Sequence, residues 1–434
     1  MSYLFSIIIP VYNSESFLSI TIDSILRQNL TNYEIILVND SSIDNTKKIC
    51  EAYKKKFNNI KLINKNINTG VGDSRNKGIK FSTGKYVVFV DSDDGLFNNS
   101  LLSLKKEIED KNEPDVIVVH YVKDTFPQSN YQLIQDNINN NNNSEDLITY
   151  LDEKKFPFAD CWSFVCKRSF VISNNIYFPE IRIGESELFV SKLICFMKNF
   201  SFMPDKFYDK KDRDFSLNHT QGYEAAKSTL ILLIEFLIFN NNITMGKIKH
   251  NFNNAYIEDA FGIFSSLLIL KDNKEIKNLS KILDKNKSNL KNFIKVPERI
   301  NLEKLILEFG SYDGLIKFRE TIINNKYDSV KGKLNKCTKI YAYCRHKYTA
   351  ATIKLLQNKG YNVVGVIDDN KSYNNSLFLD FKTINSQKFF EITQNNMSDV
   401  LVIITHQREK TLIKITDNLI KNGLHNNQIV KFKY

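Results

Sequence analysis

The sequence predicts an α/β protein whose first part forms a sheet of mostly parallel strands, followed by a helical region and a second, small α/β domain. Three observations carry this prediction. Short β-branched runs alternate with helical apolar periods up to about residue 97, long helical periods dominate residues 223–327, and the alternation returns from Thr338. The expected domains are residues 1–222, 223–336 and 337–434.

The first domain opens with the β-branched run Ser6–Val11, after which polar residues can cap a helix over Leu18–Leu26. The further elements expected there are strands at Glu34–Val38, Ile60–Ile63 and Tyr86–Val90 and helices at Thr46–Phe57 and Ser74–Phe81. The pattern becomes irregular over residues 156–220. In the last domain we expect strands at Lys339–Tyr343, Asn362–Ile367 and Val400–Thr405 and a helix at Thr349–Asn358.

Polar clusters follow three of the front strands, at Tyr12-Asn13, Asn39–Ser42 and Asp91–Asp94. In parallel sheets covered by helices, ligands bind beyond the carboxyl ends of the strands. We therefore expect these clusters to meet at one edge of the sheet, although they are far apart in sequence.

The 434 residues are 42% hydrophobic and 25% charged, which excludes a disordered chain or a small disulfide scaffold. The longest apolar stretch, Leu230–Phe239, is about half the ~20 residues that span a bilayer, and Met1–Val11 lacks the basic start of a secretory signal. We therefore expect a cytoplasmic protein. The six cysteines lack zinc-type spacing and are expected to be buried free thiols. The asparagine-rich segment 137–143 is expected to be a mobile loop.

The formal net charge of +11 lies in the rear of the chain. Residues 1–222 carry 27 basic and 29 acidic side chains, and residues 223–434 carry 33 and 20. One explanation of this positive charge is that the rear half faces an anionic surface, such as the cytoplasmic face of the inner membrane. A well-solvated Lys- and Asn-rich surface explains the charge at least as well. The rear half has no aromatic-plus-basic recognition motif, so we expect no nucleic-acid partner.

Two segments carry candidate ligand chemistry. The glycines of Asn68–Gly78 allow close backbone approach, and Arg75 near the start of the following helix can meet a diphosphate. Asp91 and Asp93 directly follow an apolar strand and offer hard oxygen ligands for Mg²⁺ or Mn²⁺. Each signal alone is weak, because acidic residues in such turns are commonly simple turn formers, but their order is specific.

With these residues assembled, residues 5–97 closely resemble the amino-terminal half of family 2 glycosyltransferases, which have the nucleotide-sugar-binding GT-A fold. The matching blocks are Ser6–Asn13, Glu34–Asp40 with Ser42 and Asp44, Gly70, Arg75–Gly78, and Phe89–Asp94. Family members usually have a second acidic residue in place of Asn39 and glycine in place of Ser41.

The resemblance implies a place for each part of a nucleotide diphosphate sugar. Pro10, Tyr12 and Asp40 would surround the base. Arg75 and Asn76 would lie near the diphosphate and the donor sugar, and Asp91 and Asp93 would bind ribose and the metal, Mn²⁺ or Mg²⁺. The remaining residues expected to bind substrate are Asn13, Ser42, Gly70 and Ser92.

Beyond residue 97 the resemblance is looser. Trp162 resembles a tryptophan that lines the acceptor side. Tyr208, Ser216 and His219 resemble landmarks near the end of the domain, where basic or polar residues close over the diphosphate. Gly184–Phe189 occupies the place of a Gly-Glu-Asp-x-x-Phe motif whose aspartate is the usual catalytic base.

That aspartate is Ser186 here, and a serine hydroxyl is not a base near neutral pH. We therefore expect Glu185, or Glu187 in its place, to take the proton, or the chain to be slow or inactive. The alternative is that the two glutamates are an exposed pair favoured by the dipole at a helix start.

The segment Lys339–Asn370 resembles the Rossmann-like unit at the front of sugar acyltransferases. The turn after its first strand, Tyr343–Lys347, has no glycine that would let a phosphate approach the backbone. We therefore expect a scaffold or partner-docking role rather than dinucleotide binding, with anion binding by Arg345, His346 and Lys347 as the alternative.

Taken together, the resemblance implies a metal-dependent, inverting glycosyltransferase. It would move a sugar from a nucleotide diphosphate sugar, expected to be UDP-linked, to a hydroxyl of a glycan or lipid-linked glycan of the bacterial surface, such as capsule or lipooligosaccharide. The alternative is a weakly catalytic or non-catalytic nucleotide-binding subunit that scaffolds a glycan assembly complex.

Overall fold

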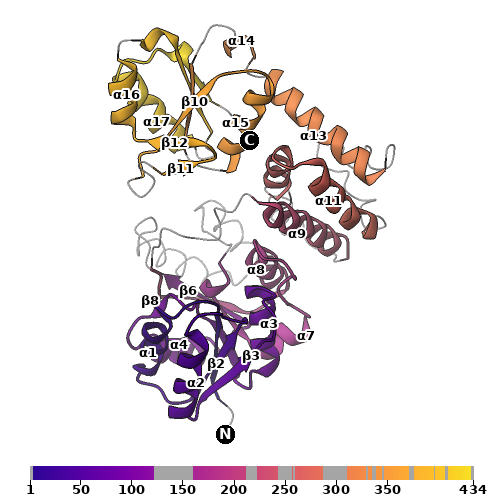
Figure 1. Ribbon diagram of the computed structural model, residues 1–434. Helices are drawn as coiled ribbons and strands as arrows, with labels where there is room; N and C mark the ends of the chain where they lie inside the picture. The colour runs from indigo at the N-terminus through magenta and orange to yellow at the C-terminus, as the bar shows by residue number, and fades with distance from the viewer. Residues whose placement is uncertain are drawn as a thin grey trace. The chain divides into compact units, whose positions relative to one another are not determined.

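The computed structural model describes residues 3–121, 160–211, 222–242, 257, 260–286, 310–328, 331–334, 339–344, 347–370, 376–394, 396–405 and 409–431. The chain divides into two compact units, residues 1–213 with 239–256 and residues 214–238 with 257–434. Figure 1 shows the elements of each unit. The division into three domains stays a prediction, and residues 137–143 lie outside the described part.

An eight-stranded sheet of order β3-β2-β1-β4-β7-β6-β8-β5 forms the centre of the first unit. Its strands are β1 (Phe5–Val11), β2 (Tyr33–Asn39), β3 (Ile60–Asn64), β4 (Tyr86–Phe89), β5 (Gly95–Leu96), β6 (Val116–Tyr121), β7 (Phe164–Lys167) and β8 (Phe200–Asp209). The strands β3, β2, β1 and β4 are parallel, whereas β7 pairs antiparallel with both β4 and β6. The sheet is therefore more mixed than expected, because β7 and β8 come from the region whose sequence pattern is irregular.

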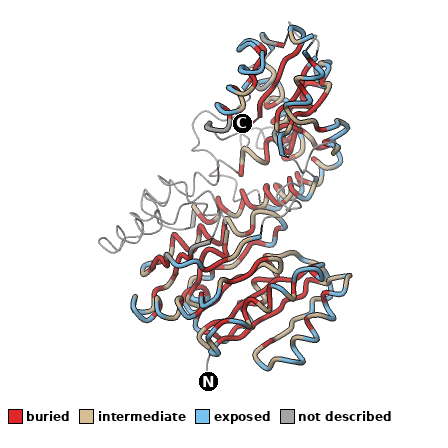
Figure 2. Tube along the Cα trace, turned by 90° about the vertical axis from the view of Figure 1, so that its left-hand side faces the viewer, coloured by how far each residue is buried: buried red, intermediate tan, exposed pale blue. Residues whose placement is uncertain are grey.

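Helices cover both faces of this sheet (Figure 1). They are α1 (Leu18–Leu26), α2 (Thr46–Lys56), α3 (Val71–Phe81), α4 (Ser100–Asp110), α7 (Arg168–Ser173) and α8 (Glu185–Phe196), and Cys161–Ser163 form one 3₁₀ turn. The strands are the most deeply buried segments (Figure 2). The α/β prediction for the front of the chain is thus confirmed.

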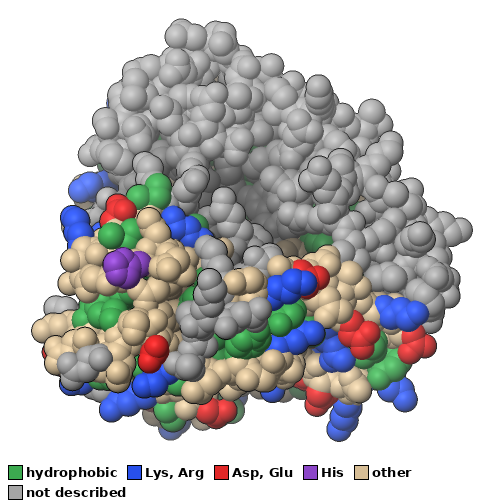
Figure 3. Space-filling model, turned by 90° about the horizontal axis from the view of Figure 1, so that it is seen from above, with side chains coloured by type: hydrophobic (Ala, Val, Ile, Leu, Met, Phe, Trp, Pro, Cys, Tyr) green, Lys and Arg blue, Asp and Glu red, His purple; other side chains and the backbone are tan. Residues whose placement is uncertain are grey.

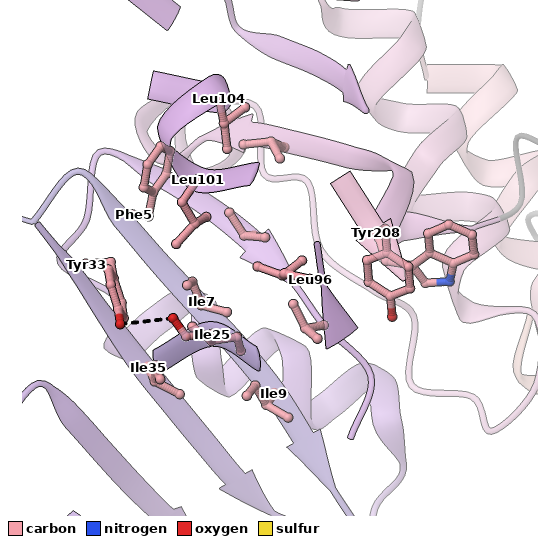
Figure 4. Close-up of a cluster of buried hydrophobic side chains, with 14 of the residues drawn as sticks. Phe5, Ile7, Ile9, Ile25, Tyr33, Ile35, Leu96, Leu101, Leu104 and Tyr208 are labelled. Carbon is pink, nitrogen blue, oxygen red and sulfur yellow. Dashed lines mark hydrogen bonds between the residues drawn. The ribbon is translucent and has the colours of Figure 1, made fainter. Parts of the chain in front are cut away.

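Side chains of β1 alternate between two apolar cores, as the two-residue period of a strand requires. Ile8 packs in a core with Ile79 of α3, and Ile7 and Ile9 belong to the core on the opposite face. Figure 4 shows part of the second core, in which the Tyr33 hydroxyl donates to the carbonyl oxygen of Ile25 at 3.1 Å. Helix α3 lies close to β1 because Gly78 lacks a side chain, and an added Cβ would lie 2.3 Å from Ile8 Cγ2.

The second unit contains a six-stranded sheet of order β11-β12-β10-β9-β13-β14. Its strands are β9 (Lys339–Tyr343), β10 (Val363–Ile367), β11 (Leu377–Phe378), β12 (Phe381–Ile384), β13 (Val400–Ile404) and β14 (Ile429–Lys431), and its helices α15 (Lys347–Asn358), α16 (Ser386–Thr393) and α17 (Glu409–Lys421). Only the pair of β11 with β12 is antiparallel among these described strands. The α/β prediction for the rear is confirmed.

The helical prediction for residues 223–327 is confirmed for the residues of this range that the structure describes. The helices there are α9 (Tyr223–Asn242), α11 (Asn273–Lys285) and α13 (Ser311–Asp328), and the short α14 (Lys331–Leu334) follows. In the described part of the chain no helix is both long and apolar enough to cross a bilayer. Lys and Arg side chains lie interspersed with Asp and Glu over the described surface in Figure 3.

The turn after β9 contains a residue with a positive φ that is not glycine. Cys344 adopts a φ of 75°, in the left-handed region that glycine enters without steric cost. The Thr349 hydroxyl donates to the Cys344 carbonyl oxygen at 2.6 Å, which ties the turn to α15. Arg345 and His346 lie outside the described residues, so anion binding there stays a prediction. Cys50, Cys161, Cys166 and Cys195 are buried free thiols, as expected, whereas Cys344 is only half-buried.

Candidate active site

The carboxyl ends of β1, β2 and β4 meet at one edge of the first sheet, and the three predicted polar clusters follow them. Pro10, buried within β1, pairs with Val38, and Val11 pairs with Asn39 in parallel register. The backbone N–H of Asn13 donates to Ser42 Oγ at 3.1 Å, and Ser14 Oγ lies 2.7 Å from Ser92 Oγ. The structure therefore brings the clusters together, as the sequence predicts.

The rim of this edge contains an exposed aromatic ring. Tyr12 is 47% exposed, directly after β1. The next residue, Asn13, has a φ of 48° and accepts from the Ile43 N–H at 3.0 Å, so the loops after β1 and β2 are joined. Tyr12 is thus a ring on a fixed backbone, available to stack on a planar ligand.

The two departures from the family pattern have structural consequences. Ser41 has a φ of 61°, which explains why glycine suits this position. The Asn39 side chain accepts from the Ser42 N–H at 3.1 Å and donates to Asn64 Oδ1 at 3.0 Å. An ionised carboxylate could accept the first of these hydrogen bonds but could not donate the second.

The Asp40 carboxylate fixes the loop that begins α3. It accepts from the Thr69 N–H at 3.0 Å and from the Gly70 N–H at 2.8 Å, and Gly70 has a φ of 101°. Asp40 is buried. In this structure the carboxylate therefore organises the backbone of residues 69–70, and its predicted contact with a nucleotide base stays a prediction.

Lys65 is a buried cation at this edge that sequence reasoning missed. Its side chain is 3% exposed, and Nζ lies 2.6 Å from Asp40 Oδ1 and 2.8 Å from Asp73 Oδ2. Burial raises the pKa of Asp73, but Lys65 and Thr69 together lower it by more than burial raises it, so the pKa lies below its ordinary value. Lys65 thereby holds the loop of Asp40 against the first turn of α3.

Arg75 joins three segments of the site. Its side chain is 4% exposed, Nη2 donates to Asp91 Oδ1 at 2.7 Å, and Nη1 donates to Glu185 Oε1 at 2.7 Å. Nη1 also lies 3.3 Å from Ser186 Oγ. Asp91 is 16 residues and Glu185 is 110 residues from Arg75 in sequence. This one guanidinium therefore fixes the relative positions of α3, the loop after β4 and the start of α8.

The charge of Arg75 is secured by its neighbours. Burial lowers the pKa of Arg75, but the Asp91 and Glu185 carboxylates raise it, and the net pKa lies above its ordinary value. The neighbouring Cys161 is a neutral thiol, because burial raises its pKa to about 12. Because Arg75 is shielded from water, its attraction to the Asp91 and Glu185 carboxylates is stronger than the same attraction would be at the surface.

Asn76, predicted to lie near the diphosphate, bonds with a loop of the protein itself. Its Nδ2 donates to the Phe178 carbonyl oxygen and its Oδ1 accepts from the Phe178 N–H, both at 2.9 Å. The Phe178 ring in turn lies 5.3 Å from the Arg75 guanidinium carbon. Asn76 therefore fixes the aromatic ring beside Arg75.

The Asp91–Asp94 loop is held by hydrogen bonds from several elements. Thr21 Oγ1 of α1 lies 2.9 Å from the Ser92 carbonyl oxygen and 2.7 Å from that of Asp94. Burial and the nearby Asp91 raise the pKa of Asp94 to about 6, although the Lys211 N–H and the Tyr208 hydroxyl stabilise its charge. The backbone of the loop is thus well defined.

The donor set of this loop fits a hard divalent cation that is also bound by phosphate oxygens of a ligand. Among the described residues, no three His, Cys, Asp or Glu side chains are grouped to hold an ion by themselves. Mg²⁺ in nucleotide sites is commonly held by one or two carboxylates together with substrate phosphates. Asp91 and Asp93 can supply those carboxylates, and Asp91 is partly exposed.

The start of α8 presents the three residues at the predicted base position. Gly184 has a φ of 81°, and Glu185 begins the helix. Glu185 is buried, which excludes the exposed helix-start pair as an explanation for this residue, and Glu187 is half-buried. Ser186 Oγ donates to Glu185 Oε1 at 3.1 Å, so that oxygen accepts from both Arg75 and Ser186.

Trp162, predicted to line the acceptor side, is only 3% exposed. Its ring stacks on Tyr208 with centroids 4.4 Å apart and planes 15° from parallel, and Lys210 Nζ lies 4.7 Å from its centroid. Here the ring packs in the protein interior, and its acceptor role stays a prediction. Ser216 and His219 lie outside the described residues.

Residues 6–172 match the family model described as Glycosyl transferase family 2. Over these residues the chain is similar to family 2 glycosyltransferases. The matched region runs from β1 into α7 and contains Asp40, Arg75 and the Asp91–Asp94 loop. Glu185 and Tyr208 lie beyond it.

Curated relatives of this region come from Bacillus subtilis and Staphylococcus aureus. The chain is 31% identical over 234 residues to the minor teichoic acid biosynthesis protein GgaB of Bacillus subtilis, covering 52% of this chain and 25% of the relative. It is 34% identical over 190 residues to the uncharacterized glycosyltransferase EpsJ of the same species, covering 43% and 54%. For the poly(ribitol-phosphate) beta-N-acetylglucosaminyltransferase TarS of Staphylococcus aureus, identity is 30% over 211 residues, covering 47% and 35%. The chain thus spans at most about half the length of these relatives.

The crystal structure of S. aureus TarS 1–349 in complex with UDP-GlcNAc has the same fold. The TM-score is 0.51 at 21% identity, covering 74% of this chain and 92% of that one. This likeness confirms the GT-A fold class.

Sequence reasoning missed Lys65, and the family landmark at Tyr208 did not predict the contact that Tyr208 makes with the loop after β4. Lys65 is one lysine among many, and only its position directly after β3, at the same sheet edge as Asp40, could have marked it. Tyr208 matched a family landmark, but its contact with the loop after β4 depends on the position of β8. Neither contact has a local sequence signal.

Proposed function

We propose that this protein transfers a sugar from a nucleotide diphosphate sugar to a hydroxyl of a bacterial surface glycan, with inversion at the anomeric carbon. The observation that carries the proposal is the link from the Asp91–Asp94 loop through Arg75 to the start of α8. It joins the predicted donor site to the predicted base position within a family 2 domain.

The proposed donor is UDP-linked. TarS, which shares this fold and is a relative at 30% identity, has a structure with UDP-GlcNAc. The proposed acceptor is a hydroxyl of a cell-surface polymer, since the GgaB and TarS names refer to teichoic acid and poly(ribitol-phosphate). Capsule and lipooligosaccharide are the other acceptors we consider, and contact with the inner membrane would bring the domain to a lipid-linked acceptor.

The proposed reaction is a single displacement. The acceptor oxygen forms a bond to the anomeric carbon while the bond from that carbon to the diphosphate breaks, and the nucleoside diphosphate leaves with the electron pair. A carboxylate at the start of α8 takes the acceptor proton, and we assign this to Glu185 with Glu187 as its substitute. Arg75 acts as a positioning residue that orients the Asp91 and Glu185 carboxylates.

Asp91 and Asp93 would hold Mn²⁺ or Mg²⁺. When bound, the cation would offset negative charge on the leaving diphosphate. The protein residues that organise the same loop are Thr21, Ser14 and Tyr208.

A second candidate function is a nucleotide-binding subunit with little or no transferase activity. The observation that favours it is Ser186 in the place of the usual aspartate, together with Glu185 already bound by Arg75. The two functions share nucleotide binding and differ in turnover.

The experiment is a thermal stabilisation screen of UDP-, GDP- and dTDP-sugars with and without Mn²⁺, with the free sugars as controls. A ligand at about 100 times its Kd stabilises the folded state by about 2.7 kcal/mol. We expect stabilisation by a UDP-sugar that increases with Mn²⁺, followed by nucleoside diphosphate release when a surface glycan is added. No stabilisation by any nucleotide sugar would contradict both functions, and binding without release would favour the subunit.

A further inference from the structure

Tyr208 makes two hydrogen bonds to the loop that carries Asp91 and Asp93. Its hydroxyl donates to Asp94 Oδ2 at 2.8 Å and accepts from the Asp91 backbone N–H at 3.1 Å. The side chain is fully buried. A tyrosine hydroxyl is suited to this place because it donates one hydrogen bond and accepts another.

The Tyr208 ring has little freedom to move. It stacks on Trp162, with the centroids 4.4 Å apart. The Asp94 carboxylate that accepts the hydrogen bond of Tyr208 also accepts from the Lys211 N–H at 2.9 Å. The end of β8 and the residues after it are therefore tied to the loop after β4 at two points, Tyr208 and Lys211.

We propose that Tyr208 is a positioning residue for donor binding. Its hydroxyl fixes the position of the Asp91 backbone directly and that of Asp94 through its side chain. These two hydrogen bonds hold the loop in the conformation that binds the diphosphate. This inference rests on the proposed function. Phenylalanine at this position would keep the ring stack but leave the Asp91 N–H without its acceptor and Asp94 without one donor. Unmade hydrogen bonds of buried groups destabilise the conformation that requires them.

The chain offers a matched control in Tyr86. Tyr86 is equally buried, and its hydroxyl donates to the Pro114 carbonyl oxygen at 2.9 Å. It begins β4, at the end of the strand opposite to Asp91. Tyr86→Phe therefore removes one buried hydrogen bond of the same sheet without touching the loop.

The experiment measures UDP binding with Mn²⁺ by calorimetry, together with the thermal midpoint and the donor kcat and KM, for the wild type, Tyr208→Phe and Tyr86→Phe. We expect both variants to lose thermal stability, and Tyr208→Phe to lose more, because it gives up two hydrogen bonds and Tyr86→Phe gives up one. Tyr208→Phe should raise the UDP Kd and the donor KM about tenfold, the effect of one lost hydrogen bond on an equilibrium constant, with a smaller change in kcat. Tyr86→Phe should keep both within about twofold of the wild type.

Asp94→Asn tests the same link if Tyr208→Phe folds poorly. The two Asp94 oxygens accept from Tyr208 and from the Lys211 N–H, and an asparagine side chain has only one oxygen in their place. We expect weaker UDP binding in this variant as well, and less than additive losses in the double variant. Equal UDP affinity in Tyr208→Phe and Tyr86→Phe would overturn the inference and leave the proposed function standing. A wild type that binds no nucleoside diphosphate would overturn the proposed function and this inference with it.

Discussion

Arg75 and Glu185 are 110 residues apart in sequence, and their side chains meet at 2.7 Å in the interior of the first unit. The same guanidinium reaches Asp91 at 2.7 Å. The buried Arg75 guanidinium therefore connects two parts of the site. One is helix α8, which supplies the proposed base, and the other is the loop after β4, which supplies the proposed metal ligands. Removal of the guanidinium should affect both stability and binding.

Arg75→Lys keeps the charge but cannot hold both carboxylates in the same geometry, because the lysine ammonium is a single point of contact. We expect a loss of about 2–4 kcal/mol in the free energy of unfolding, near the range for breaking a buried ion pair. Urea denaturation measures it. Arg168→Lys is the control: Arg168 Nε donates to the neutral Ser82 hydroxyl at 2.9 Å, so its loss should be about 1 kcal/mol or less. Equal losses in the two variants would contradict the role of Arg75.

Lys65→Met removes the cation between Asp40 and Asp73 and leaves the buried Asp40 carboxylate without its counter-charge. We expect a loss of about 2–4 kcal/mol in stability and weaker nucleotide binding, since the loop of residues 69–70 depends on Asp40. Lys47→Met is the matched control, because Lys47 and Glu51 are exposed and 3.9 Å apart, and it should change stability by about 0.5 kcal/mol at most. The account of Lys65 fails if both variants are equally stable and bind nucleotide equally well.

Glu34 provides a pH-dependent test away from the site. It is fully buried; Ser6 and Thr83 donate to it and Lys61 lies 2.6 Å from its Oε2. Burial raises the pKa of Glu34, but these partners together lower it by more than burial raises it. The folded-state pKa therefore lies below its ordinary value.

A lowered pKa means that the folded state holds its proton less readily than the unfolded chain. The stability from Glu34 is therefore present above the ordinary glutamate pKa of about 4.3 and is lost as the pH falls through the folded-state value. In urea denaturation, Glu34→Gln should be less stable than the wild type at pH 7, and the difference should shrink below about pH 4.5. A difference that stays constant from pH 7 to pH 3.5 would contradict the shift.

The choice of base is tested by Glu185→Gln and Glu187→Gln. If Glu185 takes the proton, Glu185→Gln should lower turnover by about 10²–10⁴-fold with nucleotide affinity intact, since glutamine can still accept from Arg75. Glu187→Gln should have a small effect, and Ser186→Asp should keep or raise activity. The reverse result for the two glutamates would assign the base to Glu187. Activity that arises only in Ser186→Asp would identify the native chain as a binding subunit.

Most regular elements of the parallel regions could be predicted from local sequence. The β-branched runs gave strands within a residue or two of β1 and β2, and Lys339–Tyr343 forms β9 as predicted. Helix α3 begins three residues earlier than expected, at Val71. Its start depends on the Asp40 carboxylate, which accepts from the Gly70 N–H and lies 30 residues away.

The region 160–209 could not be predicted in the same way. β7 has four residues and pairs antiparallel with β4 and β6. Elements this short owe their conformation to pairing with distant strands rather than to local periodicity. The contacts of Arg75 with Glu185 and of Tyr208 with Asp91 follow from that pairing. The sequence therefore indicated these residues one by one but did not predict that they contact each other.

The most direct test of the account is a calorimetric titration of UDP in the presence and absence of Mn²⁺, with the wild type, Asp93→Asn and the exposed control Asp110→Asn. An amide binds a hard cation less well than a carboxylate. The account predicts that Mn²⁺ strengthens UDP binding to the wild type and to Asp110→Asn, and that Asp93→Asn loses about tenfold or more of the affinity measured with Mn²⁺. Unchanged, metal-independent UDP affinity in Asp93→Asn would contradict the assignment of the Asp91–Asp94 loop as the metal and diphosphate site.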